Sequence, residues 1–275
     1  MPLEPTKTVR GVAVPSVGFG TWQVTGREAR EGVADALRAG YRHLDTAAAY
    51  TNEREVGEGL RDAGVPREDV WITSKVWMND LHRVRWSCEQ SLSHLGIDRL
   101  DLLLIHWPPE DGTLPEAALQ ELTALREEGL IRELGVSNFP PGLLRRALEV
   151  APVFCDQVEY HAQLAQPGLR AISEEHDVLL AAYAPLGSGQ SGLLEAEPVV
   201  AAARAHGCTP AQVALAWLLH QDRVVALPRS TSPGRRRENL AALDVELTED
   251  ERAALDALSA RRERLFDPSF APAWD

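Results

Sequence analysis

Cysteine is scarce in this sequence, which has only Cys88, Cys155 and Cys208 in 275 residues. Because they are scattered and odd in number, they predict neither a disulfide framework nor a cysteine-based zinc site. We expect them to be small buried hydrophobic residues, and we predict no metal site.

Long apolar runs and an excess of positive charge are also missing. No stretch approaches the roughly 18 apolar residues of a membrane span. The N-terminal segment MPLEPTKTVR lacks the apolar core of a signal peptide. The net charge of −13 argues against an extended nucleic-acid-binding surface. We therefore expect a cytoplasmic protein without membrane or nucleic-acid partners, and we expect it to be a monomer.

Lysine is nearly absent. The sequence has 28 Lys plus Arg residues, of which only Lys7 and Lys75 are lysines. Arginine is planar and keeps its proton, whereas lysine is a compact charge whose pKa responds to burial. A lysine at position 75 therefore indicates chemistry, although a structural ion pair would also explain it.

What the sequence does contain is an alternation of short apolar runs and longer amphipathic ones. With 44% hydrophobic residues, the chain can bury a full core. A small hairpin is expected from Thr8 to Val14, turning at Arg10 and Gly11. Eight strands are predicted after it: Val17–Gly20, His43–Thr46, Val70–Val76, Leu100–His106, Arg132–Ser137, Phe154–Glu159, Leu179–Ala184 and Val224–Leu227.

Helical patterns separate these strands, and glycine often ends them, as at Gly40, Gly64, Gly96 and Gly129. They include Arg27–Ala39, Val84–Leu95, Leu119–Glu128, Leu143–Val150 and Pro210–Leu219. This alternation implies parallel strands with crossover helices. Eight such units fit a single α/β domain over residues 1–275, a (β/α)8 TIM barrel with a short N-terminal β-hairpin and a C-terminal helix and tail.

A doubly wound dinucleotide-binding sheet is the rival fold, because Gly187, Gly189 and Gly192 form a GxGxxG string. That fingerprint must open directly into a helix whose N-terminus faces the pyrophosphate. Here the next helix is expected only near Pro198, and the string follows the seventh strand instead of the first. We interpret it as a long glycine-rich loop.

Ionisable residues end or follow three neighbouring predicted strands. Asp45 ends the second strand with Tyr50 five residues later, Lys75 lies near the end of the third, and His106 ends the fourth. Singly, such residues are usually turn caps, packing groups, counter-ions or core histidines. In a (β/α)8 barrel, however, the C-terminal strand ends meet at one end, where the chemistry lies. The four side chains are therefore expected to converge.

The sequence resembles the aldo-keto reductases, nearly from end to end. The matching segments are GFGTW (18–22), GYRHLDTAAAY (40–50), ITSKVW (72–77), DLLLIHWP (101–108), GVSNF (135–139), DQVEYH (156–161), AYAPLGSG (182–189) and LPRSTSPGRRRENL (227–240). The short loops are similar to those of small bacterial members, of the 2,5-diketo-gluconate reductase or aldehyde reductase type. Asp156, Ala162 and Arg229 stand where the family often has Asn, Pro and Lys.

The resemblance implies reduction of a carbonyl with a nicotinamide cofactor, and it implies that Asp45, Tyr50, Lys75 and His106 form a catalytic tetrad. Hydride transfer to a carbonyl builds negative charge on oxygen, so the site needs an acid that is protonated at neutral pH. Tyr50 is expected to be that acid, with Lys75 lowering its pKa from about 10. Asp45 would hold Lys75, and His106 would orient the carbonyl.

The resemblance also assigns cofactor contacts. Ser137, Asn138 and Gln157 are expected at the carboxamide of the nicotinamide, and Tyr183 is expected to stack on its ring. The other expected contacts are Gly20, Thr21, Trp22, Leu186, Gly187, Ser188, Arg229, Ser230, Thr231, Arg235, Glu238 and Asn239. In the loop 186–188, missing side chains would let backbone amides approach the pyrophosphate.

Arg229, Arg235, Arg236 and Arg237 crowd around a predicted helix start at Pro233. Cations in a first helical turn oppose the helix dipole by about 0.3–1 kcal/mol each, so a bound anion would explain them. A solvated polar face is the alternative, which we favour for Arg236 and Arg237. The natural anion is a 2′-phosphate, which predicts NADP(H).

Three tryptophans, Trp22, Trp77 and Trp107, follow strand ends and are expected to wall an apolar substrate pocket, with Leu265–Trp274 closing over it. Core packing is the alternative for each of them. The predicted small-molecule substrate is a moderately apolar aldehyde, ketone or diketone. The competing function is a regulatory or structural barrel that binds the cofactor with little turnover, and the complete tetrad favours an enzyme.

Overall fold

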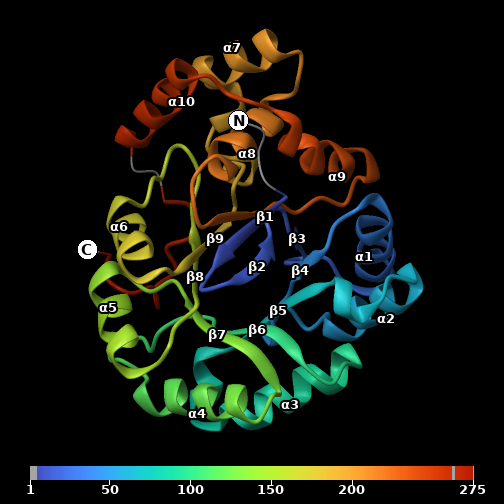
Figure 1. The fold of residues 1–275 in the computed structure, drawn as a ribbon, viewed down its shortest axis with the longest axis vertical. Coiled ribbons are helices and arrows are strands. Elements are labelled where there is room, and N and C mark those ends of the chain that lie inside the picture. The colour runs from blue at the N-terminus through green and yellow to red at the C-terminus, as the bar shows by residue number, and fades with distance from the viewer. Residues whose placement is uncertain (1–4, 262–263, 275) are drawn as a thin grey trace.

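The computed structural model describes residues 5–261 and 264–274. Eight parallel strands follow one another around a barrel in the order of the sequence (Figure 1). They are β3 (Phe19–Gly20), β4 (His43–Asp45), β5 (Trp71–Val76), β6 (Leu100–Ile105), β7 (Ile131–Ser137), β8 (Cys155–Glu159), β9 (Leu179–Tyr183) and β10 (Val224–Leu227). The prediction of a (β/α)8 barrel is confirmed.

Helices cover the outside of the barrel (Figure 1). They are α1 (Gly26–Ala39), α2 (Glu53–Ala63), α3 (Val84–Leu95), α4 (Glu116–Glu127), α5 (Pro141–Val150), α6 (Pro167–His176), α7 (Glu197–His206), α8 (Pro210–Leu219), α9 (Pro233–Leu240) and α10 (Glu249–Asp256). Most of them bury apolar residues, and the most apolar helix, α8, is buried along its length from Val213 to Leu219. In the described ranges, no helix is long and apolar enough to cross a membrane.

The barrel closes where the first strand region meets the last. Val17 bridges Ala226 in parallel, and Gly18 donates its backbone N–H to the Ala226 carbonyl at 2.8 Å. A Cβ at Gly18 would lie 2.5 Å from a methyl of Leu227 and 3.0 Å from the His43 ring, so a larger residue here would force these side chains to shift. The predicted strand Val17–Gly20 is shorter in the structure because its first half pairs with β10 and its second half with β4.

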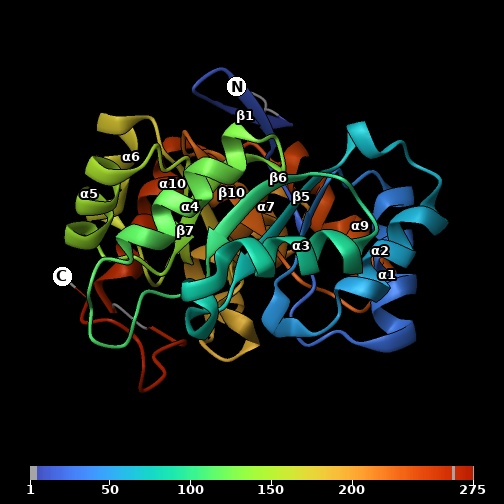
Figure 2. The same ribbon diagram turned by 90° about the horizontal axis from the view of Figure 1, so that it is seen from below.

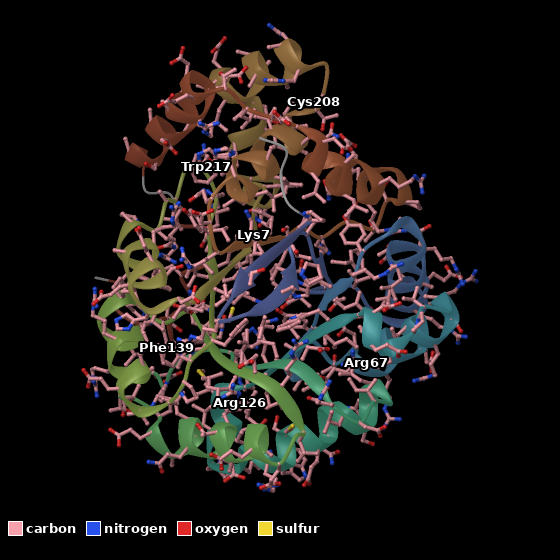
Figure 3. All side chains as sticks on the ribbon, viewed as in Figure 1. Lys7, Arg67, Arg126, Phe139, Cys208 and Trp217 are labelled. Carbon is pink, nitrogen blue, oxygen red and sulfur yellow. The ribbon has the colours of Figure 1, made fainter. Side chains whose placement is uncertain are left out.

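The predicted hairpin closes the N-terminal end of the barrel. Strand β1 (Thr6–Val9) pairs antiparallel with β2 (Val12–Pro15), and the turn places Arg10 and Gly11 at φ 48° and 75°. Figure 2 shows the hairpin at one end of the barrel and the C-terminal segment at the other. Lys7 of β1, labelled in Figure 3, donates to the carbonyl of Leu219 at the end of α8 at 2.7 Å.

The three cysteines are free thiols. Cys88 and Cys155 are buried, as expected, and Cys208 is half-buried at the end of α7. Burial raises the pKa of the Cys88 thiol to about 12, so this thiol stays protonated.

Candidate active site

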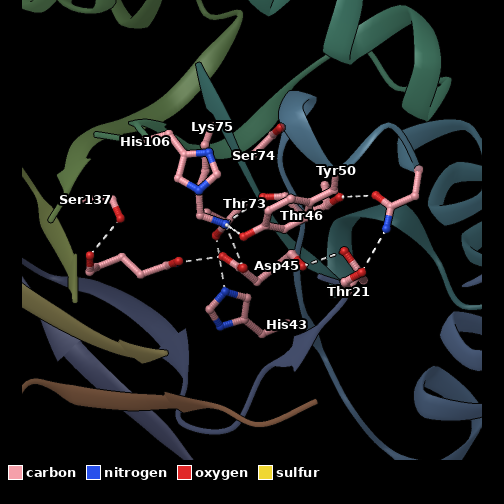
Figure 4. A network of polar contacts seen from close by, with 12 residues as sticks. Thr21, His43, Asp45, Thr46, Tyr50, Thr73, Ser74, Lys75, His106 and Ser137 are labelled. Carbon is pink, nitrogen blue, oxygen red and sulfur yellow. Dashed lines mark hydrogen bonds and ion pairs between the residues drawn. The ribbon is translucent and has the colours of Figure 1, made fainter. Parts of the chain in front are cut away.

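The four predicted catalytic residues lie together at the C-terminal end of the barrel (Figure 4). Asp45 ends β4, Lys75 lies near the end of β5, and His106 directly follows β6. Tyr50 ends a short 3₁₀ helix, Ala48–Tyr50, in the loop after β4. Because β4, β5 and β6 are parallel neighbours, their C-terminal ends are adjacent and the four side chains face one another.

Lys75 is the centre of this group. Its ammonium donates to Asp45 Oδ1 and to the Thr46 carbonyl, each at 2.7 Å, and lies 3.5 Å from the Tyr50 hydroxyl. The side chains of Lys75 and Asp45 are 0% and 6% exposed, so the ion pair is buried. An ammonium has three donors, and two of them are fixed on the wall of the barrel. The third is left for the phenol.

The pKa of Tyr50 differs from the expectation. Burial raises the pKa of this phenol well above its usual value, and the Asp45 carboxylate raises it further. The expected pKa below 10 is therefore wrong, because burial and Asp45 outweigh any lowering by the Lys75 ammonium, which lies 3.5 Å from the hydroxyl. Burial also lowers the pKa of Lys75. Tyr50 therefore holds its proton at neutral pH, which is what a proton donor requires.

His106 is buried and neutral. Burial lowers the pKa of its imidazole well below the usual value, and the Lys75 charge lowers it further. The ring packs edge-on between Tyr50 and Trp77, at centroid distances of 5.6 and 5.3 Å. No described residue accepts from or donates to its Nδ1 atom. A neutral ring with an unused nitrogen can exchange a hydrogen bond with a bound carbonyl group.

Asn52 supports the site and was missed in the sequence. This residue is fully buried; its side chain accepts from the Thr46 hydroxyl at 2.9 Å and donates to the carbonyls of Thr21 and Val24 at 2.8 Å. It therefore joins the end of β4 to the loop that carries Trp22. Its position directly before α2 suggests only a helix cap, and its side chain makes no such bond.

The residues expected at the nicotinamide carboxamide lie beside the tetrad. Gln157 donates to Asp45 Oδ2 at 2.7 Å, and Asn138 donates to the His106 carbonyl at 3.0 Å. The Tyr183 hydroxyl donates to Asn138 Oδ1 at 2.8 Å. Ser137 donates to the Gln157 carbonyl at 2.7 Å. These bonds hold the predicted contact residues in one network with the ion pair of Asp45.

Asp156, which stands where the family often has asparagine, does not join this network. Its carboxyl group is fully buried, and burial raises its pKa well above the usual value. A protonated carboxyl group is neutral and has one donor, so it resembles an asparagine amide in charge.

The other predicted cofactor contacts lie around the ends of β3, β9 and β10. Gly187 and Ser188, which follow Leu186, have φ of 63° and 51°. At β3, Gly20 ends the strand, the buried Thr21 donates to the Asp45 carbonyl at 3.0 Å, and Trp22 is 42% exposed. After β10, the exposed Arg229 donates to the Trp22 carbonyl at 3.3 Å.

The arginine cluster divides into one buried and three exposed residues. Arg236 is only 4% exposed; it pairs with Asp35 at 2.7 Å and donates to the carbonyls of Ser230 and Thr231. The prediction of a solvated Arg236 is therefore wrong, because its partner lies on α1, far away in the sequence. Arg229, Arg235 and Arg237 are exposed. The remaining contact residues, Glu238 and Asn239, are half-buried and buried within α9.

The tail, residues 264–274, crosses the C-terminal end of the barrel. Its two phenylalanines pack edge-on against four aromatic rings at centroid distances of 5.4 to 5.7 Å: Phe266 against Trp22 and Tyr183, and Phe270 against Trp77 and Trp107. The tail therefore contacts all three tryptophans, and the substrate pocket that they are expected to wall stays a prediction. Sequence reasoning did not assign the two phenylalanines that make these contacts.

Trp77 also lines a cavity of about 540 Å³ on the outer side of the site. The other lining residues are Ala48, Ala49, Glu53, Asp80, Trp86, Ser87, Gln90 and His94. Neither Trp22 nor Trp107 borders this cavity, whereas all three tryptophans contact the tail.

Comparisons with known proteins agree with the barrel fold. A model of the Aldo/keto reductase family matches residues 16–260. The chain is 39% identical to the 9,11-endoperoxide prostaglandin H2 reductase of Trypanosoma cruzi over 94% of this chain and 92% of that protein. It is 36% identical to the methylglyoxal reductase DkgA of Yersinia pestis over 98% of each chain. A crystal structure provisionally named 2,5-diketo-D-gluconic acid reductase B superimposes with a TM-score of 0.93 at 34% identity, covering 100% of this chain and 98% of that one.

Proposed function

The chain belongs to the aldo/keto reductase family, and from this premise we propose that it reduces aldehydes or ketones to alcohols with NADPH, with Tyr50 as the proton donor. Members of this family are oxidoreductases that reduce carbonyl groups and use nicotinamide cofactors. The observation that carries the proposal is the buried Lys75 ammonium, held on Asp45 and directed at the Tyr50 hydroxyl.

A nicotinamide cofactor bound at this site would supply the hydride for the carbonyl carbon. The chain's own residues deal with the charge that then forms on the carbonyl oxygen. Tyr50 gives its proton to that oxygen, and the Lys75 ammonium stabilises the resulting phenolate at short range. Asp45 keeps Lys75 charged and in place against the effect of burial, which lowers the pKa of Lys75. His106 donates from a ring nitrogen to the carbonyl and orients it.

The residues around β10 fit the phosphate-bearing end of such a cofactor. Arg229 and Arg235 are exposed, and neither forms an ion pair with any other residue that the structure describes. Arg235 lies in the first turn of α9, whose N-terminus is capped by the Ser232 side chain. Unpaired guanidinium groups beside a helix N-terminus favour a phosphate, and this chemistry supports NADPH over NADH.

The test compares two arginines of the same helix. Arg235→Ala should weaken NADPH binding about tenfold or more, since a charge-assisted hydrogen bond is worth about 1.5–3 kcal/mol, and should leave NADH binding unchanged. Arg237→Ala is the matched control and should change neither. Cofactor fluorescence titrations measure both affinities. Equal weakening of both cofactors by Arg235→Ala would show that this residue does not read the 2′-phosphate.

Activity is tested separately, with NADPH and a panel of apolar aldehydes, ketones and diketones. We expect turnover of several members of the panel. Tight NADPH binding without turnover of any of them would instead favour a cofactor-binding regulatory barrel.

A further inference from the structure

Glu159, the last residue of β8, holds the tail by its main chain. Its fully buried carboxylate accepts the backbone N–H of Leu265 at 2.8 Å on Oε1 and that of Phe266 at 3.0 Å on Oε2. His161 lies 3.1 Å from Oε1. Both carboxylate oxygens are thus committed to consecutive amides of a segment that is 106 and 107 positions away in the chain.

Two hydrogen bonds attach the described part of the tail to the barrel, beside the charge of Arg264, which also interacts with the Glu159 carboxylate. Within 5–261 and 264–274, no other hydrogen bond joins a tail residue to the barrel, and the bond from Ala271 to the Pro268 carbonyl is internal to the tail. Other contacts of the tail with the barrel include the edge-on rings of Phe266 and Phe270, and within the tail Arg264 stacks on Trp274 at 3.4 Å. Ring contacts are less directional than charge-assisted hydrogen bonds, so the carboxylate fixes where the tail crosses the site.

The position of Phe266 links this attachment to the reaction. Its ring packs on Trp22 and on Tyr183, the residue expected to stack on the nicotinamide. Tyr183 is also the register partner of Glu159 on the neighbouring strand. The backbone amide that Glu159 holds belongs to Phe266 itself, so a change in this bond moves the ring that covers the site.

We propose that Glu159 is a positioning residue that fastens the tail over the active site and thereby sets the affinity for the carbonyl substrate without taking part in the chemical step. The inference rests on the proposed reductase function. Glutamine has nearly the same shape as glutamate, but it presents one oxygen and one NH2 group. In Glu159→Gln one of the two tail amides therefore loses its acceptor and meets a donor.

The first experiment measures the tail directly and needs no catalysis. Hydrogen-exchange mass spectrometry follows peptides that contain Leu265 and Phe266 in the full-length protein. In Glu159→Gln, exchange of these amides should be about tenfold faster, the loss expected for one charge-assisted hydrogen bond. Glu53→Gln is the matched control, because Glu53 is also a buried carboxylate but bonds to Ser74 and not to the tail. Unchanged tail exchange in Glu159→Gln would overturn the proposal even if the protein is an active reductase.

The second experiment separates positioning from a general loss of structure. Glu159→Gln should raise KM for an apolar aromatic aldehyde about tenfold and keep kcat within about threefold of wild type. The reason is that the lost hydrogen bond positions the tail for substrate binding and takes no part in the chemical step. Phe266→Ala should raise KM similarly, and the double variant should be no worse than either single variant, since both act through the same ring. Additive effects, or a loss confined to kcat, would overturn the proposal. If no carbonyl is reduced by the wild type, the proposed function fails and the exchange experiment still decides the role of Glu159.

Discussion

The two ends of the barrel are built on the same eight strands, but they bury opposite kinds of side chain. At the N-terminal end the hairpin covers an apolar layer: Val9, Val14, Trp71, Leu102, Phe154, Cys155, Leu179 and Val225. At the C-terminal end Asp45, Lys75, Gln157 and Glu159 are each less than 5% exposed. Buried charge stabilises a fold weakly at best, whereas buried apolar area stabilises it strongly. Of the two ends, the N-terminal one is therefore expected to contribute more to stability, whereas the C-terminal one carries the polar groups of the site.

The two lysines show the same difference. Lys7, at the hairpin end, reaches the carbonyl at the end of α8 and is half-buried. Lys75, at the opposite end, is 1% exposed, and burial lowers its pKa. Only the second lysine lies where a compact ammonium is needed between a carboxylate and a phenol.

The largest effect is expected at the polar end. Tyr50→Phe removes the transferable proton and keeps the ring, so turnover should fall by about a hundredfold to ten-thousandfold. The melting temperature and NADPH affinity should stay close to wild type. Steady-state rates, a melting curve and a cofactor titration measure the three quantities. A variant that keeps more than a tenth of the wild-type rate would exclude Tyr50 as the acid.

Trp71→Ala tests the apolar end. It should lower stability and leave turnover nearly unchanged, the opposite of Tyr50→Phe. Trp71 is 4% exposed and stacks on Phe154 at a centroid distance of 6.1 Å. Truncation of such a side chain should lower the free energy of unfolding by about 3–5 kcal/mol, with kcat of the folded protein nearly unchanged. Denaturant unfolding provides the measurement, and Trp86→Ala, at a 45% exposed site, is the control. If Trp71→Ala and Trp86→Ala lowered the free energy of unfolding equally, the buried apolar layer would not stabilise the N-terminal end more than an exposed site does.

Lys75→Arg keeps the charge at the polar end but changes its shape. A planar guanidinium does not fit the space of an ammonium between Asp45 and Tyr50, so turnover should fall about a hundredfold. Because the site is buried, overpacking should also lower stability, by about 1–3 kcal/mol. Rates from pH 5 to 9 are compared with wild type at temperatures below the melting point. A near-normal rate with an unchanged pH profile would make Lys75 a structural counter-ion only.

A smaller effect is expected from His43, a titratable group near the apolar end. Burial lowers its pKa from 6.5 to about 4. The unfolded chain therefore binds more protons between pH 6.5 and 4, so stability is full above pH 6.5 and is lost as pH falls through this window. At pH 5 the loss should be about 2 kcal/mol relative to pH 7. His43→Gln should remove this part of the pH dependence of the free energy of unfolding. His82→Gln, at an exposed site, should leave it unchanged. If the free energy of unfolding fell by the same amount between pH 7 and pH 5 in His43→Gln and in wild type, His43 would not be the group responsible.

Sequence reasoning was sufficient where a signal is local or periodic. The barrel follows from alternating strand and helix patterns, and the convergence of Asp45, Lys75 and His106 follows from their places at three consecutive strand ends. It failed where a partner is distant in sequence. The buried Arg236 forms an ion pair with Asp35, 201 positions away, and Glu159 binds the tail, more than a hundred positions away. The pKa of Tyr50 also depends on burial and on the nearby Asp45 carboxylate, which no spacing reveals.

The closing contact between Val17 and Ala226 has a consequence for synthesis of the chain. During translation, β3 emerges near the beginning and its last neighbour, β10, near the end, so the nascent barrel remains an open sheet for most of its synthesis. The backbone N–H of Gly18, which bonds the Ala226 carbonyl in the finished protein, has no strand partner until then. An unpaired edge is a site of aggregation, and joining distant ends is slow because the intervening chain must first be ordered. Ribosome-bound chains that stop before Val224 are therefore where the need for chaperones should be greatest.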